Sequence, residues 1–210
     1  MPKRITYLTK RSELSAAHFS AHWSTLHAAI AVNLPGIESY RQNHVVGRKE
    51  SAYDIDGIVE LWFANDDVVS AGIDSDVAEQ LIEDEPRFLS GLVGGAVRSG
   101  APTMPWPFKI WVLARWSGAE QLDGVEEWAT RLARNIGAAG HAVNVTDETG
   151  PRLSREKLFV NPRPPQVAVA FGFGTDVDLA ETLPVVSASV ENVGALERVE
   201  VLFVDEVVIV

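Results

Sequence analysis

The sequence predicts an α+β fold built from two ferredoxin-like halves whose antiparallel sheets face one another and form a barrel. Two observations support this prediction. The first half of the chain shows apolar patterns in the order strand, helix, strand, strand, helix, strand, which is the split βαβ arrangement. The second half repeats this order more loosely, which indicates an internal duplication. A sheet with both helices on one side leaves its other face uncovered, and two such halves can cover each other.

The duplication is also visible in residue types. The segment ITYLTKRS at 5–12 is echoed by IWVLARWS at 110–117, and Trp23 and Trp128 follow these segments at the same distance. This register matches Ile5 with Ile110.

Three prolines within residues 101–107 disfavour a helix there and indicate an extended connector. We therefore expect one domain over residues 1–102, carrying the functional site, and a second over 103–210 that closes the barrel.

The long helix of the first half has clear signals at both ends. Ser15 is a good N-cap, and the apolar residues Phe19, Trp23, Leu26 and Ile30 recur at helical spacing. Leu34-Pro35-Gly36 then ends the helix before an extended run. The elements expected in this half are strand Ile5–Thr9, helix Ala16–Asn33, strands Ile37–Val46 and Gly57–Phe63, a helical stretch Asp66–Glu85 and strand Leu92–Ser99.

The second half is expected to repeat this order. Its elements are strands Lys109–Arg115, His141–Thr146, Val167–Phe173 and Leu196–Val204, with helices Val125–Ile136 and Val177–Thr182.

Alternation along Gly57–Phe63 separates two faces of that strand. Val59, Leu61 and Phe63 suit the helices, whereas Ile58, Glu60 and Trp62 suit the space between two facing sheets. On the preceding strand Tyr40, Gln42 and His44 share one face and Arg41 and Asn43 the other, and alternation alone does not decide which faces inward.

Composition excludes several classes of function. A net charge of −11 with 18 scattered basic residues argues against a nucleic-acid partner. The chain has no apolar run long enough for a membrane span and no export signal, so we expect no membrane partner. With no cysteine, it has no disulfide and no thiolate nucleophile, and a cytoplasmic protein fits best.

Four of the five histidines lie between Ser15 and Val46. At about 100° per residue, His22 and His27 fall on opposite borders of the apolar stripe of the helix. His18 and His22 have the i, i+4 spacing of metal ligands, but the metalloprotease pattern needs Glu where this chain has Phe19, so no metal site is expected.

These residues resemble the EthD-like family of dimeric α+β barrels. The resemblance is carried, in order, by His22-Trp23-x-x-x-His27, Leu34-Pro35-Gly36, Gln42-Asn43-His44 and Glu60-Leu61-Trp62-Phe63, followed by Asp84-Glu85-x-x-Phe88. It spans about the first 90 residues. The family implies a barrel made by two ferredoxin-like units, here supplied by one chain, with further pairing of two chains left open.

The resemblance implies that His27 and His44 are a catalytic acid and base in the barrel cavity, without metal or organic cofactor. Imidazole titrates near neutral pH and suits this role. The implied activity is a lyase, dehydratase or isomerase reaction on a small cyclic, aromatic-derived or polyketide-like substrate. Two other functions stay open: a non-catalytic small-molecule binding protein of a degradation pathway, and haem or oxygen chemistry.

Residues expected to contact the substrate or to support the histidines are Tyr7, His22, Trp23, Tyr40, Glu60 and Trp62. Glu60 or Asp56 would orient a histidine ring, whereas Asp84 and Glu85 are expected at the surface.

In the second half His22 corresponds to Glu127, His27 to Leu132 and His44 to Val145. We therefore expect one competent site per chain. The remaining histidine, His141, is expected to be structural.

Overall fold

The computed structural model describes residues 1–49, 51–73, 75–99, 105–175 and 178–210. The first half contains strands β1 (Lys3–Lys10), β2 (Ile37–Lys49), β3 (Gly57–Phe63) and β4 (Leu89–Ser99), and helices α1 (Ala16–His22), α2 (Ala28–Ala31), α3 (Asp66–Ile73) and α4 (Asp76–Asp84). A π-helical turn, η1 (Trp23–His27), joins α1 to α2, and a 3₁₀ turn, η2 (Glu85–Arg87), follows α4. The second half contains strands β5 (Phe108–Trp116), β6 (Gly140–Thr146), β7 (Val167–Phe173) and β8 (Leu196–Val208), and helices α5 (Leu122–Asn135) and α6 (Leu179–Glu191).

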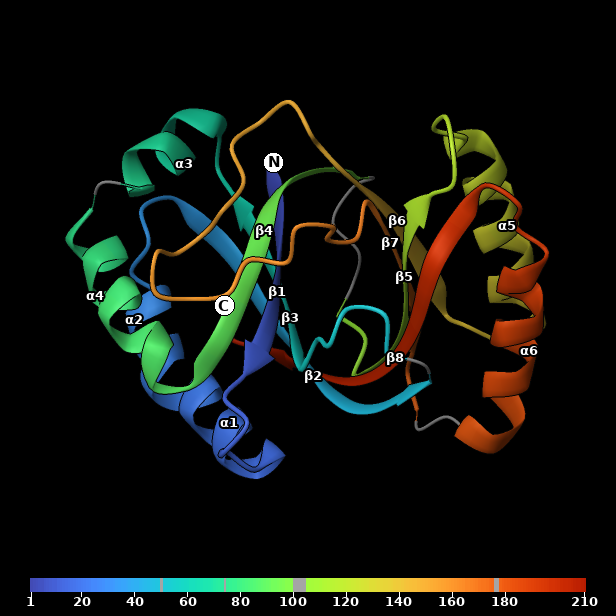
Figure 1. Ribbon diagram of the computed structural model, residues 1–210, viewed down its shortest axis with the longest axis horizontal. Coiled ribbons are helices and arrows are strands. Elements are labelled where there is room, and N and C mark those ends of the chain that lie inside the picture. The colour runs from blue at the N-terminus through green and yellow to red at the C-terminus, as the bar shows by residue number, and fades with distance from the viewer. Residues whose placement is uncertain (50, 74, 100–104, 176–177) are drawn as a thin grey trace.

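The eight strands close into one barrel in the order β1-β3-β2-β8-β5-β7-β6-β4. Each half contributes a ferredoxin-like sheet, β4-β1-β3-β2 and β8-β5-β7-β6. The halves join where β2 pairs with β8 and where β4 pairs with β6, both antiparallel. The helices lie outside the barrel, those of the first half on one side and those of the second half on the other (Figure 1). The predicted fold class is confirmed.

The pairing registers relate the two halves by a pseudo-twofold axis. Lys3 of β1 pairs with the penultimate residue of β3, and Lys109 of β5 pairs with the penultimate residue of β7. Lys3 and Lys109 are therefore equivalent, which differs by one residue from the register of the echoed segments. The sequence register was wrong because one residue fewer separates Lys109 from Trp128 than separates Lys3 from Trp23.

Apolar side chains form three layers. The barrel interior is filled from both halves, by residues that include Ile5, Ile58, Trp111 and Leu202. The helices of each half pack on the outer face of their own sheet in two further clusters. Val59 and Leu61 belong to the helix side and Ile58 to the interior, as alternation predicted.

A buried ionic network lies inside the barrel and connects the halves. Glu60 accepts hydrogen bonds from Lys3 Nζ at 2.7 Å and from Lys109 Nζ at 2.6 Å, and Lys3 also donates to Asn144 Oδ1 at 2.8 Å. Lys109 further pairs with Glu206. Burial by itself raises the pKa of Glu60, but the two ammonium groups outweigh it and hold that pKa far below its usual range. The carboxylate is thus ionised and fixes how the two sheets face each other.

Several element bounds differ from those expected. The helix predicted over Ala16–Asn33 is interrupted by the π turn, and β4 begins at Leu89 rather than Leu92. Helix α6 extends to Glu191, well past the expected Thr182, and accommodates Pro184 within it. The expected boundary at residue 102 lies outside the described residues. No helix in the described part of the chain has the length and apolar character needed to cross a membrane.

Candidate functional site

The π turn places two histidines on one side of the helix. Ala28 N–H bonds to Trp23 O, five residues back, in addition to Thr25 O. A π turn is wider than an α turn, so residues i and i+5 come onto one face. His22 and His27 therefore point the same way, and the expectation that they lie on opposite borders was wrong because it assumed an uninterrupted α-helix.

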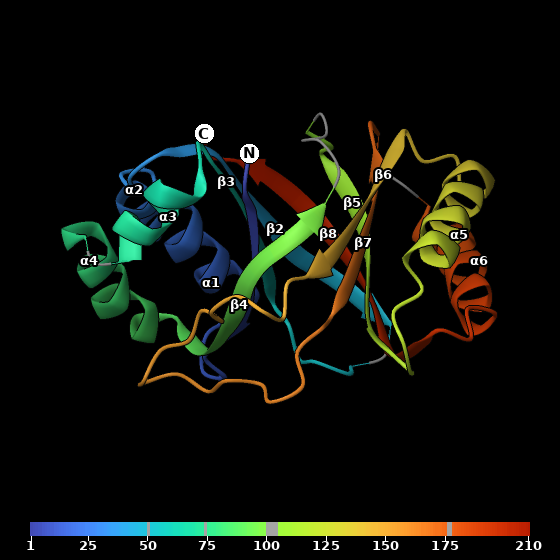
Figure 2. The ribbon, with the colours of Figure 1, turned by 90° about the horizontal axis from the view of Figure 1, so that it is seen from above.

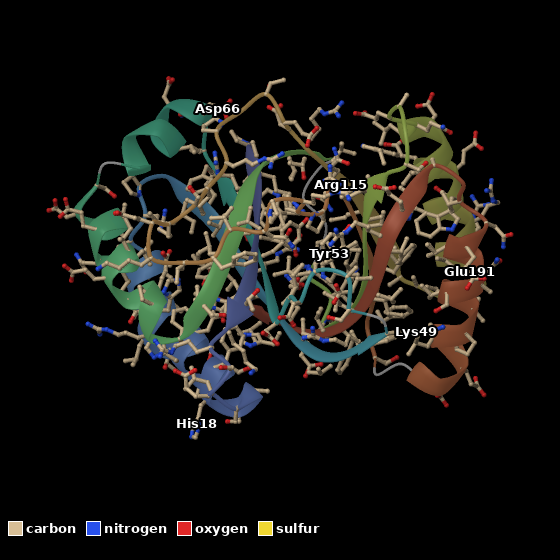
Figure 3. The ribbon with its side chains drawn as sticks, viewed as in Figure 1. His18, Lys49, Tyr53, Asp66, Arg115 and Glu191 are labelled. Atoms are coloured by element: carbon tan, nitrogen blue, oxygen red, sulfur yellow. The ribbon has the colours of Figure 1, made fainter. Side chains whose placement is uncertain are left out.

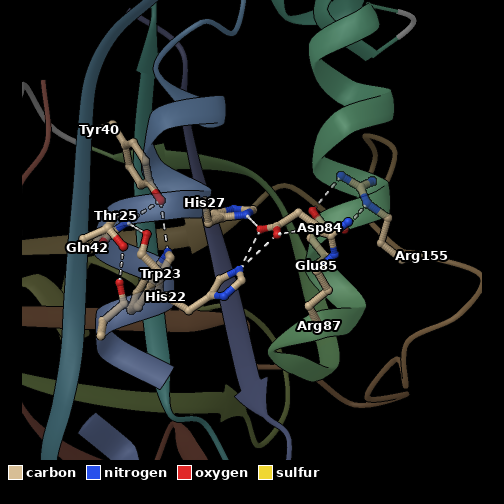
Figure 4. Close-up of polar contacts among 11 residues, drawn as sticks. His22, Trp23, Thr25, His27, Tyr40, Gln42, Asp84, Glu85, Arg87 and Arg155 are labelled. Carbon is tan, nitrogen blue, oxygen red and sulfur yellow. Dashed lines mark hydrogen bonds and ion pairs between the residues drawn. The ribbon is translucent and has the colours of Figure 1, made fainter. Parts of the chain in front are cut away.

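Both histidines bind one buried carboxylate, Asp84, at the end of α4 (Figure 4). His22 Nε2 lies 3.0 Å from Asp84 Oδ1, and His27 Nδ1 lies 3.1 Å from Asp84 Oδ2. The ring of His22 also stacks on Phe88 at 4.7 Å between centroids, and that of His27 contacts the same ring at 5.0 Å. Asp84 thus fixes the orientation of both imidazoles.

These contacts favour the ionised form of Asp84. Burial alone raises the pKa of Asp84, but the hydrogen bonds from His27 and His22 outweigh it, and the pKa lies below its usual range. An ionised carboxylate only accepts, so each histidine must donate to it. Neutral His27 then carries its hydrogen on Nδ1 and its lone pair on Nε2, the tautomer that a general base needs.

The ring of His27 lines a cavity of about 350 Å³ between the outer face of the first sheet and the helices of the first half. The wall is mostly aliphatic, and it includes Leu34, Val59, Leu81 and Leu92. The resemblance implied a site inside the barrel. That expectation was wrong, because packed side chains and the Glu60 network fill the interior.

The second half covers this cavity with the connection between β6 and β7. The residues Pro151–Arg155 of this connection line the cavity and are called the covering segment below. The connection crosses in front of β4 towards the helices of the first half (Figures 1 and 2). Leu153 exchanges two backbone hydrogen bonds with Gly94 of β4. Arg155 forms a two-pronged ion pair with Glu85, with distances of 2.6 and 3.1 Å. The cavity wall is therefore assembled from both halves.

Glu85 and Asp84 are both buried, so their expected surface location was wrong. Burial raises the pKa of Glu85, against the opposing effect of Arg155. The covering segment and the π turn supply the partners of these carboxylates, and neither is visible as a local pattern. The Asp84-Glu85 pair within the family motif was the only signal in the sequence.

His44 does not line the cavity. Its Nδ1 lies 2.9 Å from Ser20 Oγ, its Nε2 lies 3.0 Å from Gln42 Oε1, and its ring contacts Trp23 at 4.4 Å. Burial lowers the pKa of His44 to about 4, so the ring is neutral at neutral pH. Both nitrogens are occupied, and the predicted pair of His27 and His44 is not brought together in one cavity.

Gln42 connects His44 to the site. Its Nε2 donates to Trp23 O, in the π turn, at 2.9 Å and to Tyr40 Oη at 2.7 Å. Trp23 Nε1 also donates to Tyr40 Oη, at 3.0 Å. Because the Tyr40 oxygen accepts two hydrogen bonds, its own hydrogen is available to a further acceptor, and the described residues supply none. Tyr40 lines the cavity, and burial raises its pKa, so it remains a donor.

The other predicted contact residues lie elsewhere. Tyr7, Glu60 and Trp62 face the barrel interior, where Lys3 Nζ sits 4.6 Å from the ring centre of Trp62. Glu60 and Asp56 contact no histidine among the described residues; Asp56 bonds to Lys10 N and Arg48 instead. His22 and Trp23 support His27 and Tyr40 without lining the cavity. His18 points outward from α1 (Figure 3).

In its described residues the second half has no comparable histidine cluster. Val143 and Val145 pair with β7 as Gln42 and His44 pair with β3, so aliphatic side chains stand at the positions of Gln42 and His44. Its helix–sheet layer is packed with aliphatic and aromatic side chains, among them Leu132 and Phe171. Within the described residues no group of three histidine or acidic side chains is arranged to hold a metal ion.

The EthD domain family matches residues 11–91. No curated protein matches the chain. A solved anthrone oxidase-like protein aligns with 99% of this chain and 93% of its own length, with 9% identity and a TM-score of 0.60. A protein named "Putative monooxygenase" from Fusobacterium nucleatum aligns over 99% and 93%, with 8% identity and a TM-score of 0.57. At these identities the structures share the fold.

The family match includes all the side chains of the His27 cluster, from the π turn to Asp84. The motif residues follow one another in the order that the resemblance requires, and the barrel topology is the one that it implies. Residues 11–91 therefore match the EthD domain family, in agreement with the EthD-like resemblance of these motifs.

Proposed function

We propose that the chain is a cofactor-independent acid–base enzyme of lyase, dehydratase or isomerase type, acting on a small cyclic, aromatic-derived or polyketide-like compound. One observation carries the proposal: His27 lines an apolar cavity while its Nδ1 bonds to the buried Asp84. A carboxylate behind an imidazole fixes the reactive tautomer and stabilises the imidazolium that forms when the ring takes a proton.

In this mechanism His27 Nε2 removes a proton from a carbon next to a carbonyl group. The electron pair of the C–H bond forms a carbon–carbon double bond, while the π electrons of the carbonyl group move onto its oxygen. The resulting enolate oxygen accepts a hydrogen bond from Tyr40 Oη. The imidazolium then returns the proton. Delivery to the far carbon of the delocalised enolate completes an isomerisation, whereas delivery to a departing β-hydroxyl group releases water and completes a dehydration.

A single histidine therefore carries the proton in both directions. His44 acts at a distance, as a positioning residue, because it holds Gln42 and Gln42 holds both Trp23 O and Tyr40 Oη. This assignment replaces the division of acid and base roles between His27 and His44.

The alternative is a binding protein in which the same cavity only holds an apolar ligand. The cavity volume and its aliphatic wall suit both functions. The names of the structural neighbours, which include monooxygenase and anthrone oxidase, add a variant of the enzyme, since removal of a proton from an electron-rich ring also prepares it for reaction with oxygen.

The test is exchange of carbon-bound hydrogen in D₂O, followed by NMR, across a panel of cyclic ketones, lactones and β-hydroxy ketones. A base in the cavity exchanges the acidic hydrogen even where no net reaction follows. We expect exchange with the wild-type protein and a loss of about 10²-fold to 10⁴-fold with His27→Asn. Runs with and without oxygen, with oxygen uptake recorded, separate the oxygen variant. Compounds that bind with equal affinity to both proteins without exchanging would establish the binding-protein alternative.

A further inference from the structure

We propose that the ligand of this cavity is an apolar compound bearing a carboxylate, and that Arg4 binds the carboxylate at the end of the cavity away from His27. The inference deepens the proposed function, because it concerns the substrate class of the same site. It can fail or succeed independently, because it concerns binding and not proton transfer.

Arg4 belongs to the cavity because of its place on β1. Arg4, Thr6 and Leu8 alternate with the interior residues of that strand, so all three face the helices, and all three line the cavity. A charged side chain here stands beside Leu61 and Phe63 in a wall that is otherwise mostly aliphatic. A partly buried guanidinium in such a wall points to an anionic partner.

Arg4 and His27 lie towards opposite ends of β1. The ring of His27 contacts Phe88, and Phe88 O accepts a hydrogen bond at 3.0 Å from Arg11 N, just beyond the carboxyl end of the strand. Arg4 is the second residue of β1. At about 3.3 Å per residue, a ligand between them has room for an apolar body of one or two rings.

The charges along the wall favour an anion at the Arg4 end. Glu85 is the acidic side chain of the wall, and it is neutralised by Arg155. Arg4 makes one side-chain hydrogen bond, at 3.4 Å, to Pro151 O in the covering segment. Asp66 lies at the start of α3 (Figure 3). It also acts on Arg4 electrostatically, but it is not among the residues that line the cavity.

Donors other than Arg4 gather on the same wall. Thr6 is two residues along the strand, and Ser154 and Arg152 come from the covering segment. Arg152 itself pairs with Glu148 at 3.1 Å on the outside. A carboxylate at the Arg4 end would thus have the Thr6 hydroxyl on the same strand face in addition to the guanidinium, whereas Ser154 lies nearer the Glu85 end, next to Arg155.

Two probes that differ in a single anionic group test the proposal. 8-Anilinonaphthalene-1-sulfonate carries a sulfonate as a stand-in for the carboxylate, and N-phenyl-1-naphthylamine is the same body without it. Isothermal titration calorimetry would measure both with the wild-type protein and Arg4→Gln. We expect Arg4→Gln to weaken the sulfonate by roughly tenfold or more, which corresponds to one charge-assisted contact, and to leave the neutral probe within twofold.

Two further variants keep the result interpretable. Arg4→Lys retains the charge and should restore part of the affinity for the sulfonate. Leu61→Trp fills the cavity and should weaken both probes. If Arg4→Gln weakens both probes equally, Arg4 only holds the covering segment in place and the proposal fails. Unchanged affinities of the probes in Arg4→Gln, or in Leu61→Trp, would also overturn the proposal. Binding of the two probes involves no proton transfer, so a failure of the catalytic proposal leaves this measurement intact.

Discussion

His22 and His27 bind the same carboxylate, Asp84, although they are five residues apart on one helical segment. An α-helix would separate them by about 140°, from 100° per residue. The π turn between them closes this angle and brings both rings over Phe88. The orientation of the His27 ring thus depends on a local departure from regular helix.

Replacing Asp84 with Asn is expected to reduce turnover strongly while leaving ligand affinity nearly unchanged. The amide no longer enforces the tautomer with the lone pair on His27 Nε2 and cannot stabilise the imidazolium. We expect a loss of about 10²-fold to 10⁴-fold in kcat. The measurement is steady-state kinetics, or exchange in D₂O if the net reaction is unknown.

His22→Gln is the matched control, because His22 binds the same carboxylate without lining the cavity. Its effect on kcat should be at least tenfold smaller than that of Asp84→Asn. Equal effects would mean that the cluster is structural as a whole.

His44 should make stability depend on pH in the mildly acidic range. Its pKa in the folded protein is about 4, below the unfolded value near 6.5, so the unfolded state binds the proton first. The associated stability is complete above pH 6.5 and is lost as the pH falls towards 4, by up to about 3 kcal/mol. Urea unfolding of the wild type and His44→Gln at several pH values measures this difference. Parallel curves for the two proteins would contradict the assignment.

Gln42→Leu tests the connection between the π turn and Tyr40. The substitution removes donors to Trp23 O and Tyr40 Oη and leaves His44 Nε2 without its acceptor. An unsatisfied buried group costs about 1 to 3 kcal/mol, so the free energy of unfolding should fall by that amount. If Gln42 positions the site, kcat should fall at temperatures where the variant is fully folded, whereas an unchanged kcat would limit Gln42 to a structural role.

Glu60→Gln tests whether Glu60 stabilises the barrel interior or takes part in ligand binding in the cavity. Loss of the shared carboxylate leaves Lys3 and Lys109 without their common partner, and breaking a buried ion pair costs about 3 to 5 kcal/mol. Thermal and urea unfolding should show this loss, whereas ligand affinity at low temperature should be unchanged. A change in ligand affinity without a change in the free energy of unfolding would show that Glu60 contributes to ligand binding.

Arg155→Gln tests the covering segment. The variant loses the ion pair that fastens this segment to Glu85, and the buried Glu85 loses its cationic partner. We expect faster limited proteolysis between residues 147 and 166 and a raised KM. The double variant Glu85→Gln with Arg155→Gln removes both charges and should recover part of the lost stability.

Much of the fold followed from residue patterns. Ser15 caps α1 through its bond with His18 N, and the end of the helix at Leu34-Pro35-Gly36 is confirmed by the positive φ of Gly36, at 66°. A Cβ at Gly36 would also clash with the side chain of Val68. The helix cap and the helix end depend only on residues that are neighbours in the sequence, so the sequence alone predicts both.

The candidate site was only partly predictable. His27 and Tyr40, both selected from the sequence, line the same cavity, although it lies outside the barrel and not inside it. The contacts of Asp84 depend on packing of α4 against the π turn. Periodicity assumes one helical pitch, and it cannot reveal the added residue of a π turn. The faces of β2 were undecided because Gln42 and His44 are polar yet face the helices, where hydrogen bonds with Trp23 and Ser20 satisfy them.

The covering segment has an evolutionary consequence. In a pair of identical subunits, any insertion that shelters one cavity appears twice, and each copy must tolerate it next to its own helices. A fused chain is free of this constraint. Here the second half contributes Pro151–Arg155 to the cavity of the first half, so selection can alter the shape of the cavity through a segment that lies outside the matched EthD domain.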